Sequence, residues 1–101
     1  MKLQIQITPD TTKETKNALE PLYRVIIHND DVTPMDFVVN VLTSIFLVLE
    51  SDAVVIMLKA HYSGMAYVQT LPKNEAEKRI NKAHFAAGLE SYPLHFSMEP
   101  E

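Results

Sequence analysis

The stretch YRVIIHNDDVTPMDFVVNVL, residues 23–42, decides the fold. Its first part is rich in β-branched and aromatic residues and predicts a strand from Tyr23 to His28. A helix start follows, because Thr33 can cap a helix and Pro34 needs no N–H at the first helical position. The helix is predicted to run to about Leu47. Its apolar positions, at helical spacing, are Met35, Val38, Val39, Leu42, Ile45, Phe46 and Leu49.

The next part of the chain predicts a second helix and a second strand. The polar run ESD, residues 50–52, breaks the apolar pattern and opens a helix that ends near Gly64, a natural residue for a left-handed helix end. The stretch MAYVQT, residues 65–70, then predicts a strand. The inner face of the helix is expected to consist of Val54, Met57, Leu58 and His61.

The remaining residues predict a third helix and a last strand. Pro72 marks the first turn of the helix and Gly88 its end. PLHFSM, residues 93–98, alternates apolar and polar residues as a strand does. The fold class is therefore α+β: a two-layer sandwich with a three-stranded antiparallel sheet packed on three helices, in the order β-α-α-β-α-β. The inner face of the third helix is predicted to be Ala76, Ile80, Ala83 and Ala87.

Composition limits the classes of function. The chain has 101 residues, enough for one domain, and a formal charge of −4 with no basic stripe, which argues against nucleic-acid binding. There is no cysteine, which excludes disulfides and thiol nucleophiles. The longest apolar segment, Phe37 to Leu49, is too short to cross a bilayer. We expect a flexible extension over residues 1–21, a folded domain over residues 22–101, and a cytoplasmic monomer that binds no membrane.

A few polar residues have positions that suggest a binding site. Asn29, Asp30 and Asp31 stand between an apolar strand and an apolar helix, and His61 lies on the next helix. If these groups converge, they offer acceptors to an ammonium group, which has N–H donors and no acceptor. The apolar walls of such a pocket would be Met35, Val38, Met57 and Ala60. A helix cap, a turn and a core histidine would equally account for these residues.

Two chemical alternatives use overlapping residues. His28, Asp30, Asp31 and His61 could form a small metal-binding or general protein-interaction site, since imidazoles and carboxylates are zinc ligands. A nucleophilic enzyme is less well supported, because Ser63 and His61 are two residues apart on a helix and do not face each other. The chain has only 2 glycines and no Gly-rich phosphate loop. We expect neither an enzyme nor a cofactor.

Three motifs resemble those of a known family. NDDVTPMDFVVNVL (residues 29–42) is similar to the N-D-D-x-T-P-M-x-F-V-x-x-V-L signature of ClpS, the adaptor of the Clp protease. MLKAHYSGMA (residues 57–66) and YPLHFSME (residues 92–99) resemble its M-L-x-V-H-x-x-G-x-A and H-P-L-x-C-x-x-E segments. The resemblance covers residues 23–99, and the three blocks occur in the family's order.

The resemblance implies an adaptor function. ClpS proteins bind N-degrons, substrates whose N-terminal residue is Phe, Tyr, Trp or Leu, and deliver them to a ClpA or ClpC unfoldase for degradation by ClpP. The resemblance implies that Asn29, Asp30 or Asp31, and His61 bind the α-amino group, and that the segment before the domain contacts the unfoldase. Met35 matches the methionine that excludes β-branched side chains. The implied pocket walls are Ile27, Thr33, Met35, Val38, Met57, Ala60 and Leu94.

The chain departs from the family pattern at one pocket position. Ala60 stands where the family usually has valine, directly before His61. The smaller side chain predicts a larger pocket, with looser discrimination among side chains or weaker binding, since each methylene-sized group that is buried contributes roughly 0.8 kcal/mol.

Overall fold

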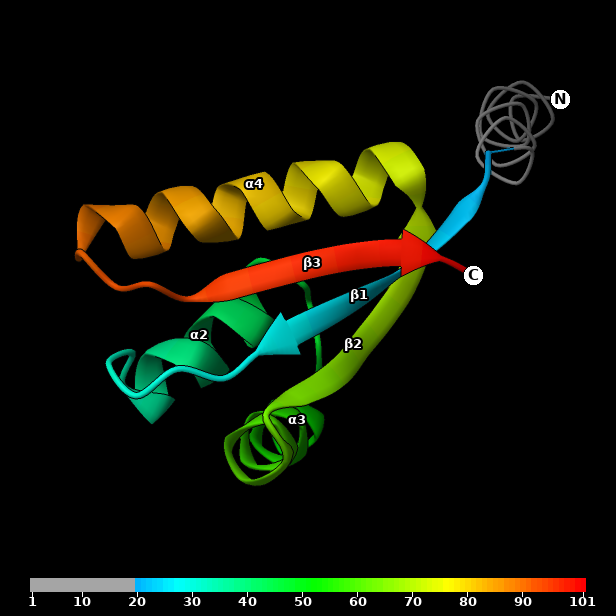
Figure 1. Ribbon diagram of the computed structural model, residues 1–101. Helices are drawn as coiled ribbons and strands as arrows, with labels where there is room; N and C mark the ends of the chain where they lie inside the picture. The colour runs from blue at the N-terminus through cyan, green and yellow to red at the C-terminus, as the bar shows by residue number, and fades with distance from the viewer. Residues whose placement is uncertain (1–19) are drawn as a thin grey trace, which may run out of the picture.

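A computed structural model describes residues 20–101, which form a three-stranded antiparallel sheet and three helices (Figure 1). The strands lie in the order β2-β1-β3, so that β1 is central. This confirms the predicted α+β fold and its β-α-α-β-α-β order. The elements are β1 (Leu22–His28), α2 (Met35–Ser44), α3 (Glu50–Ser63), β2 (Met65–Pro72), α4 (Lys73–Leu89) and β3 (His95–Pro100).

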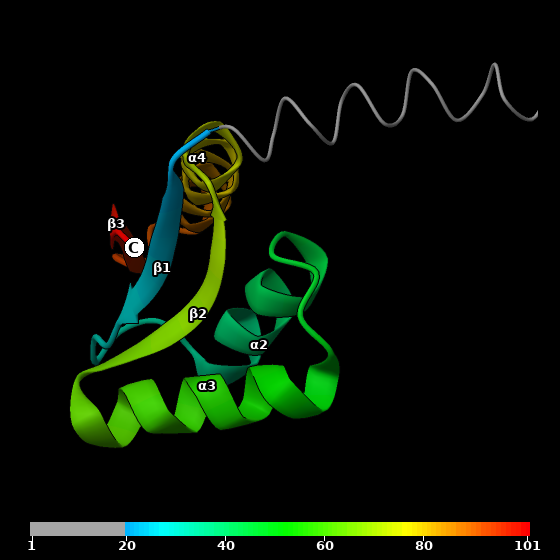
Figure 2. The same ribbon diagram turned by 90° about the vertical axis from the view of Figure 1, so that its right-hand side faces the viewer.

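The core lies between the sheet and the helices. Figure 2 shows the helices gathered on one side of the sheet, with α4 at one end and the pair α2 and α3 at the other. Val25 and Ile27 of β1 and Phe96 of β3 point into this layer and are almost completely buried. Small side chains let α4 approach the sheet closely. The four predicted inner residues of α4 are all buried: Ala76, Ile80, Ala83 and Ala87.

The first helix is shorter than predicted at both ends. Pro34 takes the cap position, so the helix starts one residue after it. At the other end α2 stops at Ser44, whose hydroxyl donates to the carbonyl of Asn40 at 2.6 Å. Such bonds compete with the helical backbone. Leu47 then adopts a positive φ of 58°, which turns the chain toward α3 and leaves Leu49 exposed instead of on an inner face.

Phe46 remains in the core although it lies beyond the end of α2. Its side chain is fully buried. Its carbonyl accepts hydrogen bonds from Gln69 Nε2 and Arg79 Nη1, both at 3.1 Å. Arg79 also donates to Glu75 Oε2 at 2.8 Å. The bonds from Gln69 and Arg79 satisfy the Phe46 carbonyl and fix the link between α2 and α3 to β2 and α4.

The predicted inner face of α3 was wrong at three of its four positions, and Met57 alone among them packs against the core. Val54 and Leu58 are 36% and 38% exposed, and His61 is exposed as well. The buried residues of α3 are Ala53 and Ala60, and Met57 is partly buried beside them. Two apolar stripes run along this helix, and the stripe with alanines packs inward because small side chains allow close helix contact. Gly64, with a φ of 93°, ends the helix as predicted.

The other boundaries differ by one or two residues. Pro72 lies at the cap of α4, just before the first turn, and the helix passes Gly88 and ends at Leu89. Of the predicted extension, residues 1–21, all but the last two lie outside the described part of the chain. Within residues 20–101, no helix combines the length and apolar composition needed to cross a bilayer.

Candidate functional site

The loop that follows β1 is organised by Asp30. One carboxylate oxygen, Oδ1, accepts hydrogen bonds from the backbone N–H of Val32 at 2.8 Å and of Thr33 at 2.6 Å. The other, Oδ2, accepts the hydroxyl of Thr33 at 2.9 Å. This is the local pattern by which Asp replaces a backbone turn. It also means that the Thr33 side chain bonds to Asp30 and does not cap α2, contrary to the sequence prediction.

These hydrogen bonds keep Asp30 ionised. Burial alone would raise the pKa of its carboxyl group, but the bonds from the Thr33 and Val32 backbone and from the Thr33 hydroxyl together lower the pKa below its ordinary value of 3.8. Each of the three bonds stabilises the charged form. Asp30 is therefore a permanent negative charge at neutral pH, and its oxygens face the turn.

The loop is tied to the end of α3 by the backbone of Asn29. Its N–H donates to the carbonyl of Gly64 at 3.0 Å. Gly64 in turn ends α3 by donating to the carbonyl of Ala60 at 2.8 Å. Because His61 lies in that last turn, the bond brings the loop of Asn29 and the histidine to the same place. The left-handed conformation of Gly64 makes this close approach possible.

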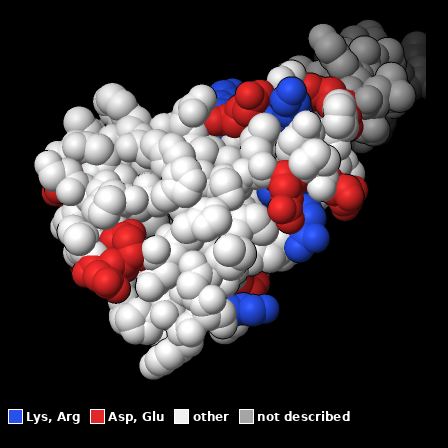
Figure 3. Space-filling view, viewed as in Figure 1, with Lys and Arg blue, Asp and Glu red and all other residues white. Residues whose placement is uncertain are grey.

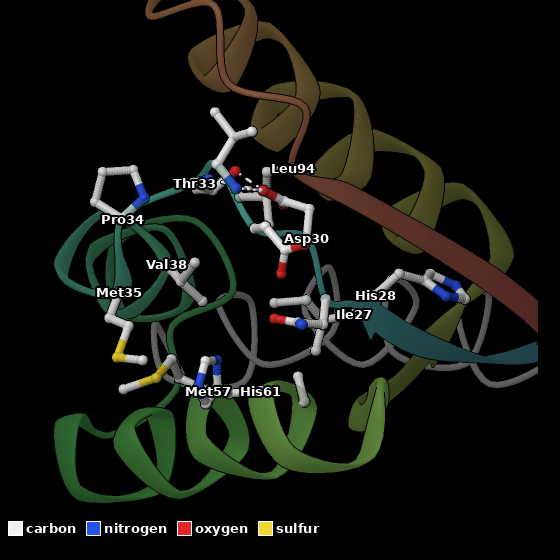
Figure 4. Close-up of a pocket in the computed structure, with 14 residues that line it drawn as sticks. Ile27, His28, Asp30, Thr33, Pro34, Met35, Val38, Met57, His61 and Leu94 are labelled. Carbon is white, nitrogen blue, oxygen red and sulfur yellow. Dashed lines mark hydrogen bonds between the residues drawn. The ribbon is translucent and has the colours of Figure 1, made fainter.

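A pocket of about 290 Å³ lies between this loop, α2 and α3. Figure 4 shows Met35 of α2 and Met57 of α3 pointing toward one another at one edge, with His61 beside Met57. Ala60 and Leu94 belong to the nearly buried part of the wall. All the residues predicted for the site line this pocket: Ile27, Asn29, Asp30, Asp31, Thr33, Met35, Val38, Met57, Ala60, His61 and Leu94.

Three further residues line the pocket that were predicted neither for ammonium binding nor for the apolar walls: His28, which the sequence analysis placed only in the alternative site, Val32 and Pro34. Each lies within the loop or next to it, so their place in the sequence was the available signal. Of these, the side chain of His28 is directed away from the pocket centre, toward β3 (Figure 4). Its Nε2 lies 2.6 Å from Ser97 Oγ.

The alternative metal set does not assemble. His28 bonds to Ser97 and Asp30 to its own turn, so these two ligands do not face His61. Among residues 20–101, no group of three or more His, Asp or Glu side chains has the geometry to hold a metal ion.

The electrostatics at this end of the molecule favour a cation. On the face shown in Figure 3, carboxylates but no basic side chains occupy the left-hand third, where Figure 1 shows the loop between β1 and α2. Asp31 is exposed at the pocket, unlike Asp30, whose oxygens are bound within the turn. The pocket thus combines a negative, polar rim with an apolar interior. Such a site can hold a group with an ammonium at one end and a hydrophobic side chain at the other.

Comparison with known proteins identifies the family. The family model described as "ATP-dependent Clp protease adaptor protein ClpS" matches residues 18–97. The chain belongs to the ClpS family. The Clp protease adaptor protein of Myxococcus xanthus is 39% identical over 95 residues, which cover 94% of this chain and 89% of that relative. ClpS 1 of Rhodopseudomonas palustris is 39% identical over 99 residues, 96% of each chain.

A solved ClpS structure has the same fold. Agrobacterium tumefaciens ClpS2, described as bound to L-phenylalaninamide, matches with a TM-score of 0.77 and 36% identity. The match covers 80% of this chain and 98% of that one. The match therefore supports both the fold and the membership of this chain among the ClpS adaptors of the Clp protease.

The different environments of the two aspartates lead to a stability prediction. Replacing Asp30 by Ala removes three hydrogen bonds and leaves backbone donors without a partner, so we expect a loss of about 1–3 kcal/mol in the free energy of unfolding. Asp31→Ala, at an exposed position, should change it by less than about 0.5 kcal/mol. Urea denaturation at neutral pH measures both, and equal losses would contradict this division.

The loss of stability caused by Asp30→Ala should depend on pH. Because the folded-state pKa of Asp30 is lowered, its stabilising contribution is complete above its ordinary value of 3.8 and is lost as the pH falls through the lower folded value. The difference in the free energy of unfolding between the wild-type chain and Asp30→Ala should therefore shrink as the pH falls below 3.8. A difference that stayed constant into the acid range would show that the carboxylate charge is not the stabilising feature.

Proposed function

We propose that this ClpS-family protein binds the N-terminal residue of N-degron substrates, preferring Phe, Tyr, Trp or Leu, and delivers them to a ClpA- or ClpC-type unfoldase for degradation by ClpP. The observation that supports this most strongly is the pocket itself, with acceptors at its rim and an apolar interior. Within a polypeptide of ordinary residues, the N-terminal residue is the one whose α-carbon carries both a primary ammonium and a side chain. The phenylalaninamide bound to the Agrobacterium relative has the same two groups.

In this proposal the ammonium group is bound by Asn29, Asp31 and His61. The Asn29 backbone is held at Gly64, which leaves its side-chain oxygen available at the rim. Asp31 is exposed beside it, and its carboxylate can accept a charge-assisted bond. Asp30 contributes its negative charge and the shape of the loop, because its oxygens already accept three bonds within the turn. A neutral ring nitrogen of His61 completes the set of acceptors.

The side chain of the N-terminal residue would enter the apolar part of the pocket. Val38, Ala60 and Leu94 are almost fully buried there and offer no polar group to it. Met35 and Met57 meet at the edge, and Met35 is 46% exposed, so the pair can adjust to the outline of the ligand. Unbranched or aromatic side chains pass between flexible methionines more easily than β-branched ones do.

The protein acts as an adaptor without chemistry of its own in this account, and it would work as a monomer. Residues 1–21 would contact the unfoldase, while residues 22–101 hold the substrate. The two tasks then reside in separate parts of the chain.

Three substitutions test the binding mode. Asn29→Ala, Asp31→Ala and His61→Ala each remove one acceptor, and we expect each to weaken binding of a Phe-starting peptide by about tenfold to a hundredfold. Asp52→Ala, at an exposed acid on α3 outside the pocket, is the matched control. Fluorescence anisotropy with a labelled peptide gives the affinities, and circular dichroism checks the fold. Wild-type affinity in all three folded variants would refute the proposal.

Ala60 tests the specificity of the pocket. Its side chain is 3% exposed and lines the pocket, so Ala60→Val places two more methyl groups in the space for the ligand. We expect the variant to favour Phe over Ile and Val more strongly than the wild-type chain does, by roughly threefold to tenfold. Peptides differing only in their first residue measure this ratio. An unchanged ranking of Phe, Leu, Ile and Val would show that Ala60 does not set the pocket size.

A further inference from the structure

Three histidines from three different elements lie together at the start of β3. The rings of His84 on α4 and His95 on β3 stack with centroids 5.3 Å apart and planes inclined by 14°. The ring of His28, at the end of β1, lies 5.1 Å from that of His95 and bonds to Ser97 through Nε2. We refer to His28, His84 and His95 as the histidine cluster. It is separate from His61, which lies on α3.

We propose that the histidine cluster is a proton-sensitive contact, which holds the start of β3 to α4 and β1 at neutral pH and releases it on acidification. The proposal concerns the folded chain itself and stands without any assumption about ligands.

The first support is the hydrogen bond between His84 and the backbone of β3. The N–H of Phe96 donates to Nε2 of His84 at 2.9 Å. A ring nitrogen can accept this bond only while it carries no proton. Among residues 20–101, β3 is an edge strand that pairs with β1 alone, so within this part of the chain a Phe96 N–H that loses His84 has no further strand to bond with. Phe96 is 1% exposed, and an unpaired N–H there would be costly.

The second support is the repulsion that would follow protonation. Two imidazolium rings stacked about 5 Å apart repel each other, since nearby like charges disfavour the charged form. His95, between the other two rings, would meet a positive charge on either side once His28 and His84 were protonated. A positive charge on more than one ring therefore works against the packing of the cluster.

In the part of the chain that the structure describes, residues 20–101, no carboxylate forms an ion pair with a histidine of the cluster. Glu99, further along β3, lies 4.0 Å from Arg24, and Asp30 directs its oxygens to its own loop. Lys82 on α4 is exposed. Because it is two residues from His84, it lies on another side of the helix. The other residues next to the cluster, one turn from His84 along α4 or opposite His28 on β2, are uncharged: Ile80, Asn81, Ala87, Gly88 and Met65.

The titration of His84 has the sign that the proposal requires. Burial lowers the pKa of His84, and the positive charge of a protonated His95 lowers it further. Because the folded-state pKa is then below the ordinary 6.5, the contribution of His84 to stability is complete above that pH and is lost as the pH falls through the lower folded value. Asp30 and Glu75, whose pKa values are also lowered, titrate well below this range.

The position of the cluster links it to the pocket. His28 immediately precedes Asn29, and His95 immediately follows Leu94, and both Asn29 and Leu94 line the pocket. Release of the start of β3 would displace one pocket wall. An effect of this displacement on peptide binding rests on the proposed function, whereas the proton-sensitive contact does not. If the protein bound no peptide at neutral pH, the proposed function would be refuted and the proton-sensitive contact would not.

The test is urea denaturation of the full chain at about pH 7.5 and about pH 5.5, for the wild type and His84→Gln. The amide oxygen of Gln accepts a hydrogen bond but does not titrate, so it retains a partner for Phe96 without the charge. For the wild type we expect the ratio of folded to unfolded protein to fall on acidification, by up to about tenfold for each unit by which folding lowers the pKa of His84. For His84→Gln the fall should be much smaller.

Two further variants make the outcome decisive. His95→Gln removes the middle ring and leaves the bond between Phe96 and His84 in place. It should also reduce the fall in the ratio of folded to unfolded protein, and it provides a test if His84→Gln does not fold. His61→Gln removes an exposed histidine outside the cluster and serves as a control for stability, with a fall equal to that of the wild type. If the wild type shows no fall, or if His61→Gln reduces it as much as the cluster variants do, the proposal is overturned.

Discussion

The carboxylate of Asp30 holds together the part of the molecule on which the rest of the site depends. It accepts bonds from Val32 N, Thr33 N and the Thr33 hydroxyl, and so turns the chain sharply between the central strand and the first helix. The turn leads the chain from β1 into α2, where Met35 points toward Met57 of α3 (Figure 4). A charged group that accepts several hydrogen bonds is both more stabilising and more directional than a neutral one.

The loop also illustrates how adjacent residues of the same type can have different roles. Asp30 and Asp31 are neighbours with the same charge, yet one is bound by the turn and the other is exposed at the rim of the pocket. In the proposed binding mode Asp30 shapes the loop, and Asp31 is available to contact the ligand. Both acids precede the N-terminus of α2, and helix N-termini favour negative charge. Acids at a helix start can therefore shape a turn and serve recognition at once.

Much of the fold could be predicted from the sequence, because local patterns specify it. The β-branched run before Asn29 and the alanine face of α4 gave the correct strand and the correct buried residues. The inner face of α3 could not be predicted in this way, since two apolar stripes compete and only tertiary packing selects the one with Ala53 and Ala60. The early end of α2 depends on the positive φ of Leu47, which no propensity indicates.

The composition of the pocket could be predicted better than its internal organisation. The resemblance to the ClpS motifs implied that the loop and α3 share one pocket, and the structure brings the predicted residues around one cavity. The bond between Thr33 and Asp30, and the direction of the His28 side chain toward Ser97, depend on side-chain geometry. The histidine cluster joins residues up to 67 positions apart, from His28 to His95, and no short sequence motif indicates it.

The central claim is that the pocket recognises a free α-ammonium group together with the side chain beside it. Isothermal titration of the wild-type chain with a short Phe-starting peptide, free or acetylated at its N-terminus, tests this most directly. Acetylation removes the positive charge and two of the three donors while keeping the side chain. The account predicts that the acetylated peptide binds at least about a hundredfold more weakly, as expected for the loss of charge-assisted bonds. Equal affinity for the two peptides would contradict it.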